Sequence, residues 1–152
     1  MTRQDILQAV RDFLAVLDEQ VLVEDRERAL RVALDRLALA YHFTEALTDD
    51  ATSPDAPDVD GVKLRKRVES CFPELGYYNE ALHITRHLGE SALGIGDAID
   101  DLVDIATELR QVLHHWENTS EAAALWHFRF GFEVHWGLHL RGLQRYLHER
   151  AF

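Results

Sequence analysis

The sequence predicts an all-α fold, a single-domain bundle of about six helices spanning residues 1–152. Along most of the chain, apolar side chains recur every three or four residues, which is the spacing of one buried helix face. A chain of this length in which 47% of the residues are hydrophobic is also long enough to bury a substantial core. Helices packed on helices are therefore the expected architecture.

The first helix is expected to begin after Thr2, because Thr2 and Asp5 have the spacing of a capping box. Its buried stripe comprises Ile6, Val10, Phe13, Leu14 and Leu17. A second helix is expected over residues 25–47, with an apolar side made of Leu30, Ala33, Leu34, Leu37, Tyr41 and Phe43. Residues 48–61 contain two prolines and five aspartates, so we expect an acidic, mobile loop there.

Three more helices are expected after this loop, joined by a turn and a connector. Residues 62–71 predict a short third helix, and FPELGYYN (72–79) predicts a turn, since Pro73 lacks a backbone donor and Gly76 tolerates a positive φ. A fourth helix is expected over residues 78–88, followed by the glycine-bracketed connector GESALGIG. Asp97 then has the type and position of a cap for a fifth helix that continues to about residue 116.

In the segment ALWHFRFGFEVHWGLHL (124–140), apolar and polar residues alternate over residues 126–140, which is typical of a strand. A strand of 15 residues would extend roughly 50 Å and would need an alternating partner, which the sequence lacks. Read as a helix, it has one apolar stripe at Leu125, Phe128, Phe132, Trp136, Leu140, Leu143 and Leu147, and a second at Trp126, Phe130, Val134 and Leu138. We therefore expect a long, buried, aromatic C-terminal helix over residues 120–148.

The formal net charge of −11 disfavours binding to nucleic acid or to anionic membranes. The basic cluster KLRKR (63–67) follows the acidic loop and is interpreted as a solvated helix face. Cys71 is the single cysteine, and the chain starts without the charge and apolar pattern of a secretory signal. These observations predict a cytoplasmic protein.

FPELGYYN, GDAIDDLVDIATELR and ALWHFRFGFEVHWGLHL resemble segments of a bacterial family of all-helical domains of unknown function. The resemblance covers roughly residues 70–147. It implies a helical fold and a cytoplasmic bacterial source, and it implies no activity, substrate or site residue.

The fifth predicted helix carries the first candidate site. Asp97, Asp101, Asp104 and Glu108 are spaced by four, three and four residues, which places four carboxylates on one helix face with Asp100 beside them. Carboxylates in this arrangement can hold Mg²⁺ or Mn²⁺ for work on phosphate substrates. The alternative interpretation is a solvated acidic face that also suits the helix N-terminus electrostatically.

Histidines form the second candidate site. His83 and His87 are four residues apart, and so are His135 and His139, so each pair can present two imidazoles on one helix face to a transition metal. Glu80 and His83 have the Glu-x-x-His spacing of di-iron bundles, and Glu133 lies beside His135 in the sequence. A di-iron site requires two such units and the sequence offers one, so a structural role for these histidines stays open.

No complete catalytic set is recognisable in the sequence, and no cofactor is predicted, although a divalent metal is compatible with either cluster. The leading hypothesis is a non-catalytic interaction domain that forms a homodimer or binds a protein partner. The alternative is a metal-binding helical bundle or an Mg²⁺- or Mn²⁺-dependent phosphohydrolase. A third hypothesis is a pH-responsive protein, because protonation of all nine histidines would raise the formal charge from −11 to −2.

Overall fold

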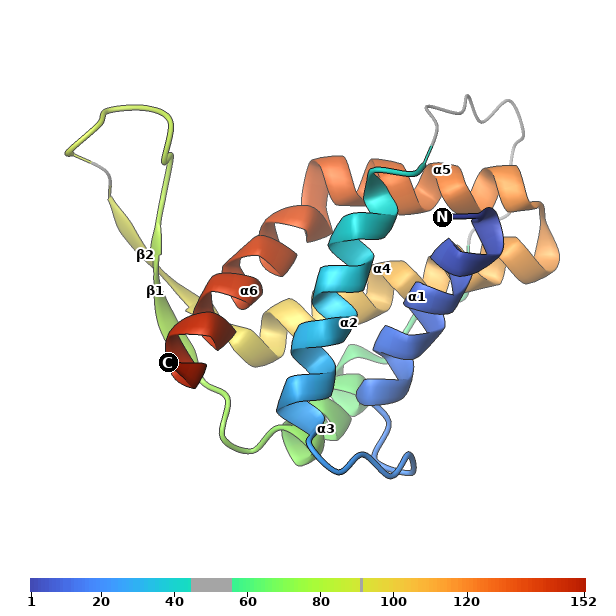
Figure 1. Cartoon of the computed structure of the whole chain (residues 1–152), viewed down its shortest axis with the longest axis horizontal. Coiled ribbons are helices and arrows are strands. Elements are labelled where there is room, and N and C mark those ends of the chain that lie inside the picture. Colours follow the sequence, from blue (N-terminus) through green and yellow to red (C-terminus); the bar gives the residue numbers. More distant parts are fainter. Residues whose placement is uncertain (45–55, 91) are drawn as a thin grey trace.

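A central helix, α4 (Ala98–Asn118), organises the structure (Figure 1). The computed structural model describes residues 1–44, 56–90 and 92–152. Within them, α4 contacts α1 (Arg3–Val16), α3 (Gly61–Cys71), α5 (Glu121–Gly131) and α6 (Gly137–Ala151), and ten of its residues are buried. Its N-cap is Asp97, whose carboxylate accepts hydrogen bonds from the amides of Ile99 and Asp100, so the predicted cap is confirmed. The core of the molecule therefore lies around α4.

The N-terminal helices α1 (Arg3–Val16) and α2 (Arg26–Tyr41) pack against each other. The capping box is confirmed, because the Thr2 and Asp5 side chains each accept a hydrogen bond from the other's amide. Of the predicted stripe on α1, Leu14 is only partly buried, and the other four side chains are buried. Helix α2 ends at Tyr41, earlier than expected, and Phe43 beyond it is exposed. Residues 45–55, which include most of the predicted acidic loop, lie outside the described residues.

The third helix is confirmed as α3 (Gly61–Cys71), capped by Asp60. Arg65 on its surface binds Asp97 and Asp100, with N–O distances of 2.7 and 3.0 Å, and also Glu69. At least this member of the basic cluster is paired with carboxylates of its own chain.

The predicted fourth helix is wrong, because an antiparallel hairpin stands in its place. Strands β1 (Tyr77–Ala81) and β2 (Leu93–Asp97) pair with Tyr78 opposite Gly96 and Asn79 opposite Ile95. In the segment that joins the strands, His83 and His87 have φ values of 55° and 51°, in the left-handed region that a continuous right-handed helix excludes. The fold is therefore mostly helical with one small sheet, and the strict all-α expectation is corrected.

The hairpin projects from the bundle (Figure 1). Side chains alternate between its two faces. Tyr78 and Glu80 share the inner face with Gly94 and Gly96. On the outer face, Tyr77, Leu93 and Ile95 are 75%, 72% and 78% exposed.

The C-terminal segment is helical, as predicted, and consists of α5 (Glu121–Gly131), the π-helical turn η1 (Phe132–Trp136) and α6 (Gly137–Ala151) in succession. Its first stripe packs into the core, where Phe128, Trp136 and Leu140 are fully buried. The expectation of a helix buried on both stripes is wrong, because Phe130, Val134 and Leu138 are exposed. The reason is that α4 occupies the centre, so α5–η1–α6 covers it from outside and buries only the side that faces it.

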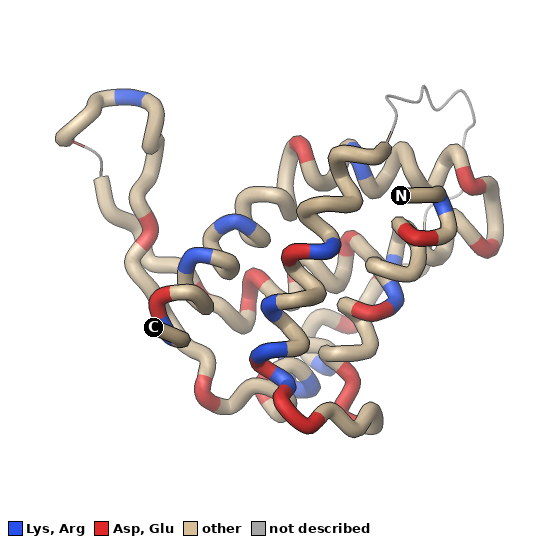
Figure 2. Tube along the Cα trace, viewed as in Figure 1, with Lys and Arg blue, Asp and Glu red and all other residues tan. Residues whose placement is uncertain are grey.

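Lys, Arg, Asp and Glu residues are distributed along the helices of the bundle (Figure 2). The connection between β1 and β2 carries a single Arg or Lys, Arg86 (Figure 2). Among the described residues, no helix has both the length and the apolar character that crossing a bilayer requires.

A candidate metal centre between α4 and α6

Asp104 of α4, His135 of η1 and His139 of α6 converge at the contact between these elements. Each offers one potential ligand atom, and these three atoms all lie within 4.8 Å of one another. The His139 Nε2 atom is 3.6 Å from Asp104 Oδ2, and the two imidazole rings meet edge to face with centroids 5.0 Å apart. The structure thus combines one member of the predicted acidic face with one of the two predicted histidine pairs.

Asp101 orients His139. Asp101 is buried, and its Oδ1 lies 2.7 Å from His139 Nδ1. Because an ionised carboxylate can only accept hydrogen bonds, His139 must donate from Nδ1. Its Nε2 atom is then the one directed at Asp104. A metal-binding histidine usually donates a hydrogen bond from its other ring nitrogen to a carboxylate or carbonyl, as His139 does here.

Glu108 plays the same part for His135. The Glu108 Oε1 atom lies 3.0 Å from His135 Nδ1, so the ring again donates from Nδ1 and keeps Nε2 for another partner. The His135 side chain is 46% exposed, which leaves the centre open to solvent on this side. Asp101, Asp104 and Glu108 thus form a continuous row, with the outer two holding the histidines and the middle one between them.

The π-helical turn shapes this region of the helix. In η1 the amide of Gly137 donates to the carbonyl of Phe132, five residues earlier. A Cβ atom on Gly137 would lie 2.2 Å from that carbonyl oxygen, so the turn requires glycine there. Because η1 contains His135 and α6 contains His139, the turn sets how the two imidazoles approach α4. Single π turns inside α-helices are frequent at functional sites.

The electrostatics of the cluster follow from burial and pairing. Burial raises the pKa of Asp104, and the neighbouring Asp100 and Asp101 charges add to the effect against the opposing influence of His139 and His135. The hydrogen bond with Asp101 raises the pKa of His139 despite the opposing effect of burial. The two histidines thus offset the charge of the Asp104 carboxylate only in part, and a metal ion would offset it further.

The other two carboxylates of the predicted acidic face do not join the centre. Asp97 and Asp100 bind the Arg65 guanidinium instead. Burial alone would raise the pKa of Asp97, but hydrogen bonds from Arg65 and from the amides of Asp100 and Ile99 hold it below its ordinary value.

Among the alternative candidates, His83 and His87 lie exposed in the segment that joins β1 to β2, since the helix that would have aligned them does not form. Glu80 sits on the inner face of β1, and its charge acts on His139, but it is not one of the three clustered groups. Glu133 accepts a hydrogen bond from Tyr41 and forms an ion pair with Arg129, at 2.9 Å each, and the bond with Tyr41 ties η1 to the end of α2. These residues do not form the predicted histidine site.

The site residues predicted from the sequence do not include Tyr78. Its hydroxyl donates to Asp101 Oδ2 at 2.6 Å. Burial, followed by the hydrogen bond to Asp101, raises its pKa, so the phenol keeps its proton. The sequence did not point to Tyr78, because a predicted helix over residues 78–88 hid the two-residue period that places it on the inner face of a strand.

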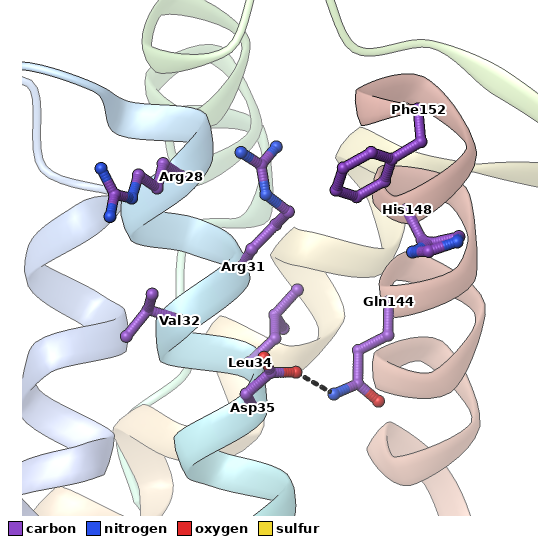
Figure 3. A pocket seen from close by; sticks show the side chains of 8 residues that line it. All are labelled: Arg28, Arg31, Val32, Leu34, Asp35, Gln144, His148 and Phe152. Atoms are coloured by element: carbon purple, nitrogen blue, oxygen red, sulfur yellow. Dashed lines mark hydrogen bonds between the residues drawn. The ribbon is translucent and has the colours of Figure 1, made fainter.

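A hollow of about 410 Å³ lies elsewhere, between α2 and α6 (Figure 3). Its lining residues are Arg28, Arg31, Val32, Leu34, Asp35, Gln144, His148 and Phe152. Several of its polar groups already have partners within the chain, since Arg31 pairs with Glu27 and Asp35 accepts from Gln144. The hollow shares no residue with the histidine–carboxylate cluster, which is the better candidate because its ligand atoms converge.

Comparison with known proteins places the chain by fold. A family model described as "Domain of unknown function (DUF5063)" matches residues 3–152. The crystal structure of protein BF1032 from Bacteroides fragilis is similar, with a TM-score of 0.76 and 18% identity over 98% of this chain and 91% of that chain. At this identity the likeness supports the fold alone. A comparison with curated proteins finds no match.

Proposed function

The chain belongs to the DUF5063 family of domains of unknown function, and we propose that it binds a divalent transition-metal ion through Asp104, His135 and His139. The proposal rests on one observation, which is that a carboxylate orients each of the two imidazoles through a hydrogen bond. Each histidine is bonded at Nδ1 to a carboxylate, Asp101 or Glu108, so that both Nε2 atoms are kept for a shared partner.

Two imidazole nitrogens and one carboxylate favour Zn²⁺, Fe²⁺ or a related transition ion over Mg²⁺, which prefers an all-oxygen shell. Three protein ligands also leave a position for water. This is the arrangement of catalytic rather than structural zinc sites, and a bound water of lowered pKa is its usual reagent. The reaction class that such a centre would support is metal-assisted hydrolysis.

The test compares the two histidine pairs, with His135 and His139 as the proposed ligands and His83 and His87 as the control. Zinc and magnesium are titrated calorimetrically into metal-stripped wild type, into the double variant H135N/H139N and into H83N/H87N. Asparagine suits the control because it tolerates the left-handed φ of His83 and His87. We expect one zinc ion per chain in wild type and in H83N/H87N, little response to magnesium, and no zinc uptake by H135N/H139N. Absence of zinc binding in wild type, or equal binding by both double variants, contradicts the proposal.

A second candidate function is self-association through the hairpin. It is favoured by the outer face of the ribbon, where Tyr77, Leu93 and Ile95 are exposed together on a two-stranded element. Exposed apolar patches of this kind mark interaction surfaces. A second copy offers the same face, as the self-complementary contact of a two-fold dimer requires. Sedimentation equilibrium measures the outcome, and a monomer at all accessible concentrations contradicts this candidate.

A further inference from the structure

The inner face of β1 meets α6 in a slot that fits one side chain, Tyr78. A Cβ atom on Gly96, opposite Tyr78 in the ladder, would lie 2.4 Å from the tyrosine ring. A Cβ atom on Gly142 of α6 would lie 2.5 Å from the tyrosine hydroxyl oxygen. Neither glycine has a positive φ, so the slot uses their lack of a side chain rather than their backbone freedom.

From this slot, hydrogen bonds lead directly to the candidate metal centre. The Tyr78 hydroxyl donates to Asp101 Oδ2 at 2.6 Å, and Asp101 Oδ1 accepts from His139 Nδ1 at 2.7 Å. A carboxylate with one oxygen fixed cannot rotate without losing that bond, so the tyrosine determines where the other oxygen points. The Tyr78 ring also stacks on Tyr146 of α6, with centroids 5.0 Å apart, which holds the base of the hairpin on that helix.

We propose that Tyr78 is a positioning residue of the metal centre and that, through it, metal binding is coupled to docking of the β1–β2 hairpin on α4 and α6. This inference rests on the proposed function. When Tyr78 is seated, Asp101 holds His139 with Nε2 directed at the ion. When the hairpin moves away, Asp101 loses one partner and His139 loses its fixed orientation.

The coupling must act in both directions, because binding free energies are linked reciprocally. A bound ion stabilises the oriented His139, and with it the Asp101–Tyr78 bond that anchors the hairpin. A two-stranded ribbon is marginal on its own, and the outer face of this one lacks cover. Its docking therefore depends on its inner-face contacts, and the Tyr78 hydroxyl provides a polar contact with α4.

The matched variants are Y78F and Y77F, neighbouring tyrosines on opposite faces of β1, of which Tyr77 is exposed. Zinc affinity is measured by chelator competition. We expect Y78F to bind zinc about tenfold more weakly, at the low end of the range for residues behind a metal ligand, and Y77F to bind as wild type does. Amide hydrogen exchange of residues 77–81 and 93–97 is measured with and without zinc. We expect zinc to slow exchange in wild type and in Y77F but not in Y78F.

A second variant, G142A, separates positioning from folding. Alanine favours a helix interior more than glycine does, yet its Cβ would displace the tyrosine hydroxyl. We expect weaker zinc binding in G142A, while the metal-free variant still unfolds in one cooperative thermal transition. If wild type binds zinc and both Y78F and G142A match its affinity, the inference is overturned while the metal centre stands. If zinc leaves hairpin exchange unchanged in wild type, the coupling is overturned. If wild type binds no zinc, the proposed function fails and this inference fails with it.

Discussion

Both ends of the predicted acidic face, residues 97–108, carry carboxylates, but the surroundings of the two ends differ. At the N-terminal end, Asp97 and Asp100 bind Arg65, whose guanidinium carries a permanent charge. One turn further on, Asp101, Asp104 and Glu108 face two histidines, which can exchange a proton for a metal ion. The comparison teaches that the partner across the helix contact, rather than the carboxylate spacing, separates a structural ion pair from a candidate metal centre.

The largest effect is expected from a substitution in the candidate metal centre. D104N removes a ligand oxygen and should lower zinc affinity by more than about 100-fold, or roughly 2.7 kcal/mol, which exceeds the usual loss for a residue behind a ligand. D100N is the control, because Asp100 binds Arg65, and its zinc affinity should equal that of wild type. Both affinities are read by chelator competition.

The stability of the metal-free D104N variant provides an independent measurement. Burial raises the pKa of Asp104, so the neutral amide should leave the free energy of unfolding equal to or higher than that of wild type in urea. A large loss of stability in D104N would instead show that Asp104 has a structural role, as Asp97 does.

The next effect concerns the π turn that presents the histidines. G137A would place a Cβ atom against the carbonyl of Phe132, and overpacking of this kind typically costs about 1–3 kcal/mol of unfolding free energy. We also expect weaker zinc binding, because His135 and His139 flank the turn. The control is G61A, where an added Cβ has no heavy atom within 4 Å among the described residues. Urea denaturation showing equal stability for G137A and G61A would contradict the requirement for glycine.

The smallest effect is expected at the ion pair between Asp97 and Arg65, and it is an effect on stability that depends on pH. The folded-state pKa of Asp97 is lowered, so its ionised form stabilises the fold. This contribution is present above the unfolded-state pKa of about 3.9 and is lost as pH falls through the lower folded-state value. D97N keeps a side chain that can cap α4 but cannot ionise. The acid-induced loss of unfolding free energy between pH 5 and pH 2 should therefore be smaller in D97N than in wild type, by about 1 kcal/mol or less. Identical acid transitions would exclude a stabilising Asp97–Arg65 pair.

Residues 77–97 interrupt the succession of helices, and they show where a local sequence pattern fails to predict the structure. The sequence predicted a helix over residues 78–88, whereas the structure has a hairpin there. Tyr78 gains a stacked ring on α6 and a buried carboxylate on α4 only as a strand residue above Gly96. Both partners are distant in sequence, so no local window registers these contacts.

The sequence by itself determined most of the helices and the caps at Thr2 and Asp97, because a periodic apolar stripe and a capping side chain act within a few residues of each other. It supplied both the carboxylate row on α4 and the pair His135 and His139, but it left them as competing sites. Only the tertiary structure decided that they form one cluster, that Arg65 takes Asp97 and Asp100, and that the outer stripe of α5–η1–α6 faces solvent. These outcomes depend on which helix lies at the centre of the bundle. That is decided by how much apolar surface each helix can bury against all the others, which no short stretch of sequence shows.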